Sequence, residues 1–401
     1  MATPSHEENV RLVQEHVRVR GPDVVKEPAG ILPYRYMIPS GYYQQMWCWD
    51  TAFMGAGSLQ SLPHAAAYLA DAMKNYLHLT SADGDIPGCV TPKGFSPTLR
   101  HAKPVLIWAA YCAARASGDF TQFAPFLPQM EALLAYWDAG RRFDAATGLH
   151  VWFDVMECGA DDAPWYEPAS GHTPGWTEEK DAYRVAAPDL QTFLVREHRA
   201  LALFRRRWAE AADAAVAGAA AAPGSSAAAA AAALPPDVAA AIARHDAKVA
   251  SLTHALNAHL WHWADEAAGE GYYVAYDVRA RAQLRARTYQ AAWPLWEHLA
   301  PSRAHADAAV RAIMAPDLRC ASGVRSTSSA HPLYSNTNMI TPYSNWRGPV
   351  CACGRAPCVR ANEGAPSANA ARHSVLRVCC ALGNSDSPTP KRPAKIGRAH
   401  V

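Results

Sequence analysis

Residues 190–208, LQTFLVREHRALALFRRRW, carry a clear helical pattern. The apolar residues of this stretch recur at helical spacing and lie on one face of an α-helix: Leu190, Phe193, Leu194, Leu201 and Phe204. A helix with one apolar face must bury that face against another element. This stretch therefore predicts a domain built by packing helices together.

Other stretches on either side of residues 190–208 also predict helices. Ser117-Gly118-Asp119 is a turn signal between two of them, and Pro301 is a hinge between two more. Strand signals are few, and residues 271–278 give the best one. The sequence thus predicts an all-α array of helical hairpins, and periodicity leaves open a bundle, a solenoid or a closed toroid. The further predicted helices span residues 62–77, 105–116, 123–137, 237–260, 288–299 and 303–314.

The charge balance of the chain excludes some classes of partner. Its 401 residues carry a net charge of +2, which gives no reason to expect a nucleic-acid or anionic-membrane partner. The polar residues 1–14 lack the apolar core of a secretory signal, and no apolar stretch is long enough to span a membrane. We therefore expect a cytoplasmic protein, and its oligomeric state stays open.

Cysteine placement gives little support for a metal. Half of the ten cysteines are scattered singly through the first 350 residues, where we expect buried small side chains. The others crowd the last 51 residues, but Cys351, Cys353 and Cys358 lack the paired Cys-x2-Cys spacing of zinc ribbons. We expect neither a metal nor another cofactor.

Two segments depart from the helical pattern. Residues 211–241 are Ala-rich and contain the run SAAAAAAA at 226–233, so we interpret them as a low-complexity, partly helical insertion between two helices. Residues 351–401 have no sustained periodicity and are rich in Arg, Pro, Ser, Ala and Cys. The sequence therefore predicts one domain over residues 1–350, followed by a non-native or disordered tail.

Two polar and aromatic segments near the N-terminus are candidates for chemistry. Residues 42–50, YYQQMWCWD, place four rings and one carboxylate just before a helix. Either they form a binding surface, or Asp50 caps the helix among packed aromatic residues. Residues 83–94, DGDIPGCVTPKG, form a structured loop. In this loop Lys93 either meets an anionic substrate group or is an ordinary solvated lysine.

Two further segments of this kind follow. Residues 153–166, FDVMECGADDAPWY, hold four carboxylates among apolar neighbours, an environment that raises a carboxyl pKa and suits a general acid. The alternatives are a Ca²⁺-binding loop and a plain turn. Residues 334–350, YSNTNMITPYSNWRGPV, combine amides, hydroxyls and rings that suit a polyhydroxylated ligand, or else form a surface loop that caps helix ends.

The four segments, in this order, resemble the mannosylglycerate-hydrolase-like glycoside hydrolases, which are related to the processing α-glucosidases and more distantly to trehalases. Residues 47–50 resemble the family's W-x-W-D, and residues 84–94 resemble its substrate loop. Residues 158–162, CGADD, are similar to S-G-x-D-N, with Cys and Asp as replacements. Residues 343–350 resemble Y-S-N-W-x-G-P-V-W without its last Trp. No GxSxG, GxGxxG, Walker A or HExxH motif favours another enzyme class.

The resemblance implies an incomplete (α/α)6 toroid and an inverting mechanism, with an acid and a base about 6.5–9.5 Å apart. The motif match implies that Asp161 is the acid and that Glu157 and Asp162 tune it. A glycerate carboxylate would need a cation, for which Lys93, Arg100 and Lys103 are candidates. The remaining residues that the resemblance places at the sugar are Tyr43, Trp47, Trp49, Asp50, Tyr343, Asn345, Trp346 and Gly348.

The family's catalytic base is a Glu beyond the last motif, and no residue here matches it. Only Glu363 and Asp386 are acidic after Val350, and neither lies in a family-like context. We therefore expect a C-terminally truncated, inactive and poorly soluble chain. Its parent would hydrolyse short α-glycosides such as mannosylglycerate or glucosylglycerate. The alternatives are a non-catalytic sugar-binding remnant, an α-glucosidase or trehalase-like hydrolase, and a helical scaffold for protein partners.

Overall fold

Helices dominate the computed structural model, which describes residues 6–39, 43–95, 101–160, 163–164, 183–220, 235–320, 323–332 and 334. The helices are α1 (His6–Val24), α2 (Cys48–Ser58), α3 (Ala65–His78), α4 (Leu106–Ser117), α5 (Leu127–Asp138), α6 (Val155–Cys158), α8 (Pro188–Ala220), α9 (Pro236–Leu260), α10 (Trp293–Trp296) and α11 (Arg303–Ile313). The short 3-10 helices among the described residues are η1 (Thr121–Phe126), η2 (Gly140–Arg142) and η4 (Tyr289–Ala292). The predicted all-α fold is confirmed in this part of the chain.

Short strands lie between the helices, and every strand pairing among the described residues is antiparallel. The strands are β1 (Val25–Lys26), β2 (Tyr36–Met37), β3 (Met46–Trp47), β4 (Cys89–Thr91), β5 (Gly94–Phe95), β6 (Phe143–Asp144), β7 (Leu149–His150), β8 (Val185–Ala186), β9 (Trp261–Asp265), β10 (Glu270–Tyr273), β11 (Ala275–Asp277), β12 (Ala282–Leu284), β13 (Arg319–Cys320) and β14 (Gly323–Val324).

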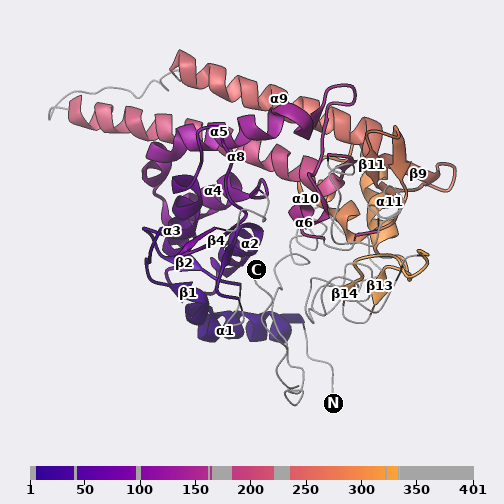
Figure 1. The fold of residues 1–401 in the computed structure, drawn as a ribbon, viewed down its shortest axis with the longest axis horizontal. Coiled ribbons are helices and arrows are strands. Elements are labelled where there is room, and N and C mark those ends of the chain that lie inside the picture. The colour runs from indigo at the N-terminus through magenta and orange to yellow at the C-terminus, as the bar shows by residue number, and fades with distance from the viewer. Residues whose placement is uncertain are drawn as a thin grey trace.

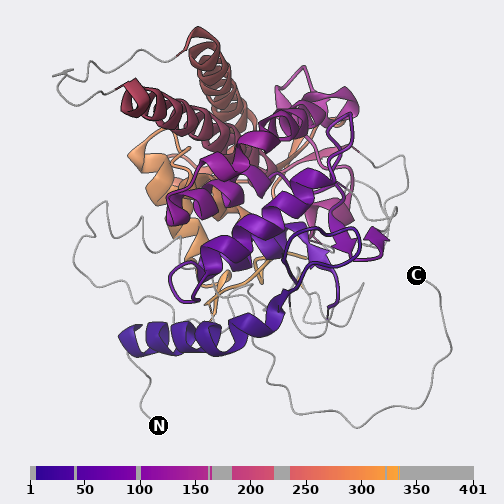
Figure 2. The ribbon, with the colours of Figure 1, turned by 90° about the vertical axis from the view of Figure 1, so that its left-hand side faces the viewer.

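The longest helices, α8 and α9, lie side by side and extend beyond the body of the protein (Figure 1). Ala202 and Ala209 of α8 form a small buried cluster with Val238 and Ile242 of α9. Helix α1 lies at the opposite end of the molecule in both views (Figure 2). The predicted Ala-rich insertion begins inside α8 and ends inside α9, and residues 221–234 lie outside the described residues.

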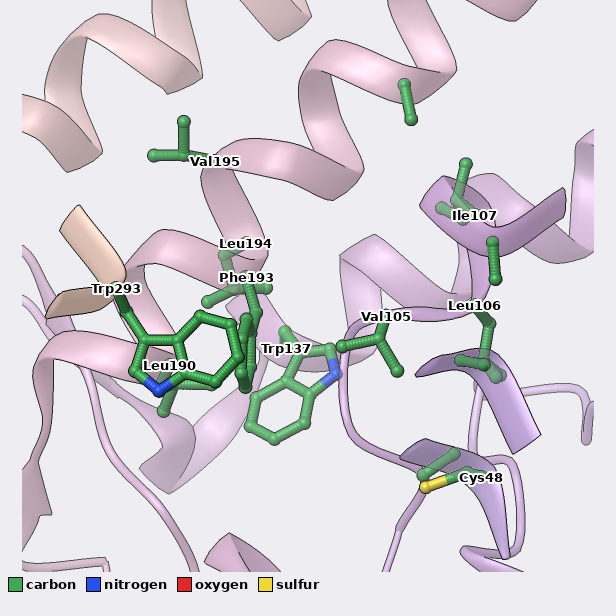
Figure 3. Close-up of a cluster of buried hydrophobic side chains, with 14 of the residues drawn as sticks. Cys48, Val105, Leu106, Ile107, Trp137, Leu190, Phe193, Leu194, Val195 and Trp293 are labelled. Atoms are coloured by element: carbon green, nitrogen blue, oxygen red, sulfur yellow. The ribbon is translucent and has the colours of Figure 1, made fainter. Parts of the chain in front are cut away.

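The apolar core joins helices that are distant in the sequence (Figure 3). Phe193 of α8, Trp293 of α10, Trp137 of α5 and Ile107 of α4 are all at most 6% exposed. Burying a large apolar side chain contributes roughly 1.5–3 kcal/mol. The predicted apolar face of residues 190–208 is therefore buried, and it holds α8 against α4, α5 and α10.

A buried carboxylate joins α8 to the start of α4. Glu197 of α8 accepts hydrogen bonds from the backbone amides of Ile107 at 2.9 Å and Trp108 at 2.8 Å. The first amides of a helix have no partner within the helix, so Glu197 acts as a cap supplied by another element. Burial raises the pKa of Glu197 to about 7, and the amides of α4 act in the opposite direction.

Several predicted helices proved to be interrupted. The helix predicted over residues 123–137 is a 3-10 helix up to Phe126, followed by α5, because Pro125 lacks an N–H group. The helix predicted over residues 288–299 consists of η4 and α10 instead, and His298 with a φ of 56° follows it. The strand predicted over residues 271–278 is divided into β10 and β11, which pair with different strands.

Helix α1 was not among the predicted helices. Its apolar side chains are largely exposed, with Leu12 at 49% and Val19 at 54%, so it lacks the buried stripe on which the other predictions depended. None of the described helices has both the length and the apolar character needed to cross a membrane.

A polar cluster links α5, α8 and α9. Glu131 of α5 forms an ion pair with Arg205 of α8, and the same carboxylate oxygen lies 3.1 Å from Nε2 of His245 on α9. His245 Nδ1 lies 3.0 Å from Nδ1 of His198 on α8. Partial burial opposes ionisation of Glu131, but its bonds to His245 and Arg205 outweigh burial and lower its pKa to about 2.

We expect Glu131→Gln to make the free energy of unfolding depend less on pH in the acidic range. A carboxyl with a lowered pKa in the folded state stabilises the fold above its unfolded pKa, near 4.5, and loses that contribution as the pH falls toward 2. Urea unfolding from pH 6 to pH 2 should therefore show a difference between wild type and variant that shrinks with falling pH. Glu210→Gln, in an exposed pair, is the control. A difference that is constant with pH would contradict this account.

Candidate active site

Two of the predicted motifs are hydrogen-bonded to each other in a three-stranded sheet. Strand β3 pairs with β4, so that Met46 lies opposite Val90 and Trp47 opposite Cys89. The backbone amide of Cys48 donates to the carbonyl oxygen of Gly88 at 3.0 Å, and β4 pairs in turn with β5. The W-x-W-D segment and the substrate loop therefore form one local structure.

The first motif is positioned by the start of α2. Trp47 is the N-cap residue with an extended backbone, and Asp50 lies in the first turn. The alternative in which Asp50 is the N-cap is therefore wrong, because the helix begins two residues before it. A carboxylate in the first turn is stabilised by the positive end of the helix dipole. Among the described residues the buried Nε1 of Trp47 has no hydrogen-bond partner.

Lys103, Trp49 and Gly159 meet at one point, which we call the Lys103 junction. The Lys103 side chain is buried, with the residue 7% exposed, and its Nζ lies 4.5 Å from the centroid of the Trp49 ring. Gly159 has a φ of 73°, and a Cβ there would lie 2.8 Å from Lys103 Cε and 2.9 Å from Trp49 Cζ2. Only glycine fits both the backbone conformation and the space. The junction therefore joins the first and third motifs.

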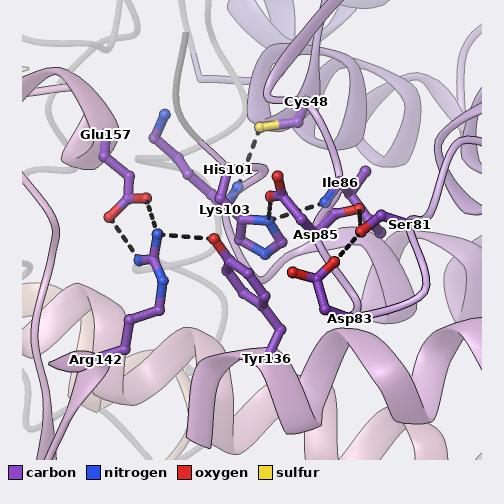
Figure 4. Close-up of polar contacts among 10 residues, drawn as sticks. All are labelled: Cys48, Ser81, Asp83, Asp85, Ile86, His101, Lys103, Tyr136, Arg142 and Glu157. Carbon is purple, nitrogen blue, oxygen red and sulfur yellow. Dashed lines mark hydrogen bonds and ion pairs between the residues drawn. The ribbon is translucent and has the colours of Figure 1, made fainter. Parts of the chain in front are cut away.

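Glu157 lies directly before this junction, in α6, and is 2% exposed (Figure 4). Its carboxylate accepts two hydrogen bonds from Arg142, at 2.8 and 2.9 Å, and one from the amide of Phe153 at 2.6 Å. Burial opposes the charge on Arg142, but the Glu157 carboxylate outweighs burial and raises the Arg142 pKa above its ordinary value. The Glu157 carboxylate is therefore bound by groups of the protein.

A sequence comparison decides the family. Residues 42–352 match the family described as the mannosylglycerate hydrolase MGH1-like glycoside hydrolase domain. This chain belongs to that glycoside hydrolase family. The match begins at the first aromatic segment and ends next to Val350, after which the sequence analysis found no further similarity.

Individual relatives agree with this family. A periplasmic trehalase from Pseudomonas aeruginosa is 30% identical over 123 residues, which are 30% of this chain and 21% of the trehalase. The matched part therefore spans about a fifth of that relative.

Two solved structures share the fold. An uncharacterised conserved protein from Thermus thermophilus aligns over 83% of both chains with a TM-score of 0.58 and 16% identity. A GH63 mannosylglycerate hydrolase from the same organism, in complex with glucose, aligns over 86% of this chain and 83% of that one, with a TM-score of 0.54 and 17% identity.

Loop 84–94, which resembles the family's substrate loop, is held by the buried His101. Nδ1 of His101 lies 2.7 Å from Asp85 Oδ1 and 3.0 Å from the amide nitrogen of Ile86 (Figure 4). The hydrogen bond to His101 lowers the pKa of Asp85, whereas burial lowers the pKa of His101. Lys93, by contrast, lies exposed on the turn between β4 and β5, and Tyr43 is 40% exposed beside Trp47.

Several predicted site residues lie outside the described residues, so the structure does not place them. They are Arg100, Asp161, Asp162, Tyr343, Asn345, Trp346 and Gly348.

One buried carboxyl near the junction was not among the predicted site residues. Asp189, at the start of α8, is 2% exposed and accepts hydrogen bonds from the Leu190 amide at 2.7 Å and from Trp152 Nε1 at 3.3 Å. Burial raises its pKa to about 6. In the sequence, an acidic residue at the start of a helix is indistinguishable from an ordinary solvated one, so no signal could have singled it out.

We expect Gly159→Ala to disrupt the Lys103 junction. A methyl group at this position meets Lys103 and Trp49, and the positive φ is strained for alanine, so the free energy of unfolding should fall by about 1–3 kcal/mol. Urea unfolding measures this change. Gly118→Ala is the matched control, because Gly118 also has a positive φ, of 75°, but a Cβ there meets no atom within 4 Å. Equal losses for both variants would show that the junction is not tightly packed.

Proposed function

We propose that this protein is an inverting glycoside hydrolase of short α-glycosides, with mannosylglycerate or glucosylglycerate as its substrate. The Lys103 junction carries the proposal. It sets a buried ammonium group and an indole ring beside the segment that leads into Asp161. Aromatic rings stack on sugars, and a buried cation favours an anionic group on the substrate.

In this mechanism Asp161 is the general acid that protonates the glycosidic oxygen. Inversion also needs a second carboxylate, about 6.5–9.5 Å away, that activates a water molecule on the opposite face of the sugar. Trp47 contributes its indole N–H, which is unpartnered among the described residues, to a sugar hydroxyl. Asp50 binds further hydroxyls, and Asp162 tunes the acid. Tyr43, Asn345, Tyr343, Trp346 and Gly348 complete the proposed pocket.

Lys103 is the favoured partner for the glycerate carboxylate. No described carboxylate lies within ion-pair distance of its ammonium group, which is nearly fully buried. Burying an unpaired charge is costly, so an anionic ligand would relieve that cost. Lys93 is more accessible to solvent and fits this role less well.

We expect Lys103→Met to remove discrimination between charged and neutral ligands. Calorimetric titration should show that the variant binds mannosylglycerate at least about tenfold more weakly, because a charge-assisted hydrogen bond is lost. Its affinity for methyl α-mannoside should change little. Lys93→Met, on the turn between β4 and β5, is the control. Equal losses for both ligands would contradict a role for Lys103 in reading the carboxylate.

A trehalase-like or α-glucosidase activity is the second candidate, favoured by the 30% identity to the P. aeruginosa trehalase over 123 residues. Titration with trehalose and methyl α-glucoside beside mannosylglycerate separates the two. Tighter binding of trehalose would favour the second candidate. A protein that binds sugar without chemistry is the third.

The second carboxylate of this mechanism has no assigned residue. Glu363 and Asp386 are the only acidic residues of segment 351–401, and neither matches the family's base. NMR detection should show release of mannose or glucose that Asp161→Asn abolishes, although the variant still binds the ligand. Binding without release of sugar by the unaltered protein would favour the third candidate.

A further inference from the structure

Arg142 lies outside the predicted motifs and is the centre of a buried set of contacts (Figure 4). It ends the 3-10 helix η2, is 6% exposed, and lies between the segment of Glu157 and the ring of Tyr136. Its guanidinium carbon lies 4.9 Å from the Tyr136 centroid and 4.7 Å from the Trp137 centroid. The planar guanidinium can stack on rings and bind a carboxylate in a bidentate manner at the same time.

On one side, Arg142 holds the segment that ends in the Lys103 junction. Its two hydrogen bonds to Glu157 are joined by the bond from the Phe153 amide to the same carboxylate. The amide of Glu157 donates to Asp154 Oδ1 at 2.8 Å, which closes the turn. Glu157 is therefore fixed both at its backbone and at its side chain, two residues before Gly159.

On the other side, Arg142 reaches the substrate loop through two rings. Its Nη2 donates to the Tyr136 hydroxyl at 3.4 Å, and the Tyr136 ring lies 4.1 Å from the His101 ring. His101 in turn contacts Asp85 and the Ile86 amide. These contacts connect loop 84–88 with segment 157–160 without passing through the sugar-contacting residues.

We propose that Arg142 is a positioning residue, which fixes segment 157–160 relative to loop 84–88 and so holds Gly159 against Lys103 and Trp49. Lysine at this position would keep the charge but lose the bidentate geometry. The position of the segment is a property of the protein alone. Its consequence for saccharide binding rests on the proposed function.

Cys158 supplies a native probe of this position. It follows Glu157, is 1% exposed, and becomes accessible only when segment 157–160 opens. The alkylation rate of a buried thiol follows the population of the open state. Cys112 reports on another part of the molecule, since it lies on α4, whereas Cys89 directly follows loop 84–88.

The test is alkylation of the full chain with iodoacetamide, followed by peptide mass analysis. We expect Arg142→Lys to accelerate alkylation of Cys158 roughly tenfold or more, with the rate at Cys112 changed less than about twofold. Glu157→Gln should give the same pattern while keeping the shape of the side chain. Arg205→Lys, which alters the ion pair with Glu131, should leave Cys158 unchanged. An unchanged Cys158 rate, or equal acceleration at Cys158 and Cys112, would overturn the proposal.

Titration with mannosylglycerate completes the test. We expect Arg142→Lys to bind it about tenfold more weakly than wild type and than Arg205→Lys, because binding geometry depends on the junction. Opening at Cys158 with unchanged affinity would overturn the positioning role. If wild type binds no saccharide, the proposed function fails, and the alkylation pattern still decides whether Arg142 holds the segment.

Discussion

The carboxylate of Glu197 joins the two helices on which the candidate site depends. The side chain extends from α8 and accepts hydrogen bonds from amides in the first turn of α4. These bonds fix the start of α4 relative to α8. Lys103 lies only three residues before α4, and its own amide donates to Cys48 Sγ at 3.3 Å. The cap on α4 therefore also helps to place the buried lysine beside Trp49.

The site is assembled from loops that these helices hold in place. Strand pairing joins the first two motifs, and the Lys103 junction joins the first and third. Phe53 of α2 lies behind Trp49 and contacts Trp293 and Trp108 at ring-centroid distances of 5.8 and 5.6 Å. These packed aromatic rings support Trp49 from behind. A binding residue keeps its geometry when packing supports it in this way.

Prediction from sequence succeeded where a local pattern had one physical cause. The apolar stripe of residues 190–208 predicted a helix with a buried face, and the structure has both. Prediction failed where proline interrupts a helical pattern, as at Pro125, and where a helix has no buried apolar stripe, as in α1. Arg142 and Asp189 were missed because a charged side chain shows no sign in the sequence of being buried; burial depends on which elements cover it.

The helical class, the order of the motifs and the family could be predicted without coordinates, because they depend on local periodicity and on residue identity. Which of the candidate groups meet depends instead on how distant segments pack. Lys93 and Lys103 are equivalent as residue types, yet Lys93 is exposed on a turn and Lys103 is buried against Trp49. The sequence gives no partner for the Glu157 carboxylate, whereas in the fold it forms an ion pair with Arg142. The reason is that charge and hydrogen-bonding capacity belong to the residue, whereas burial and partners belong to the packing of distant segments.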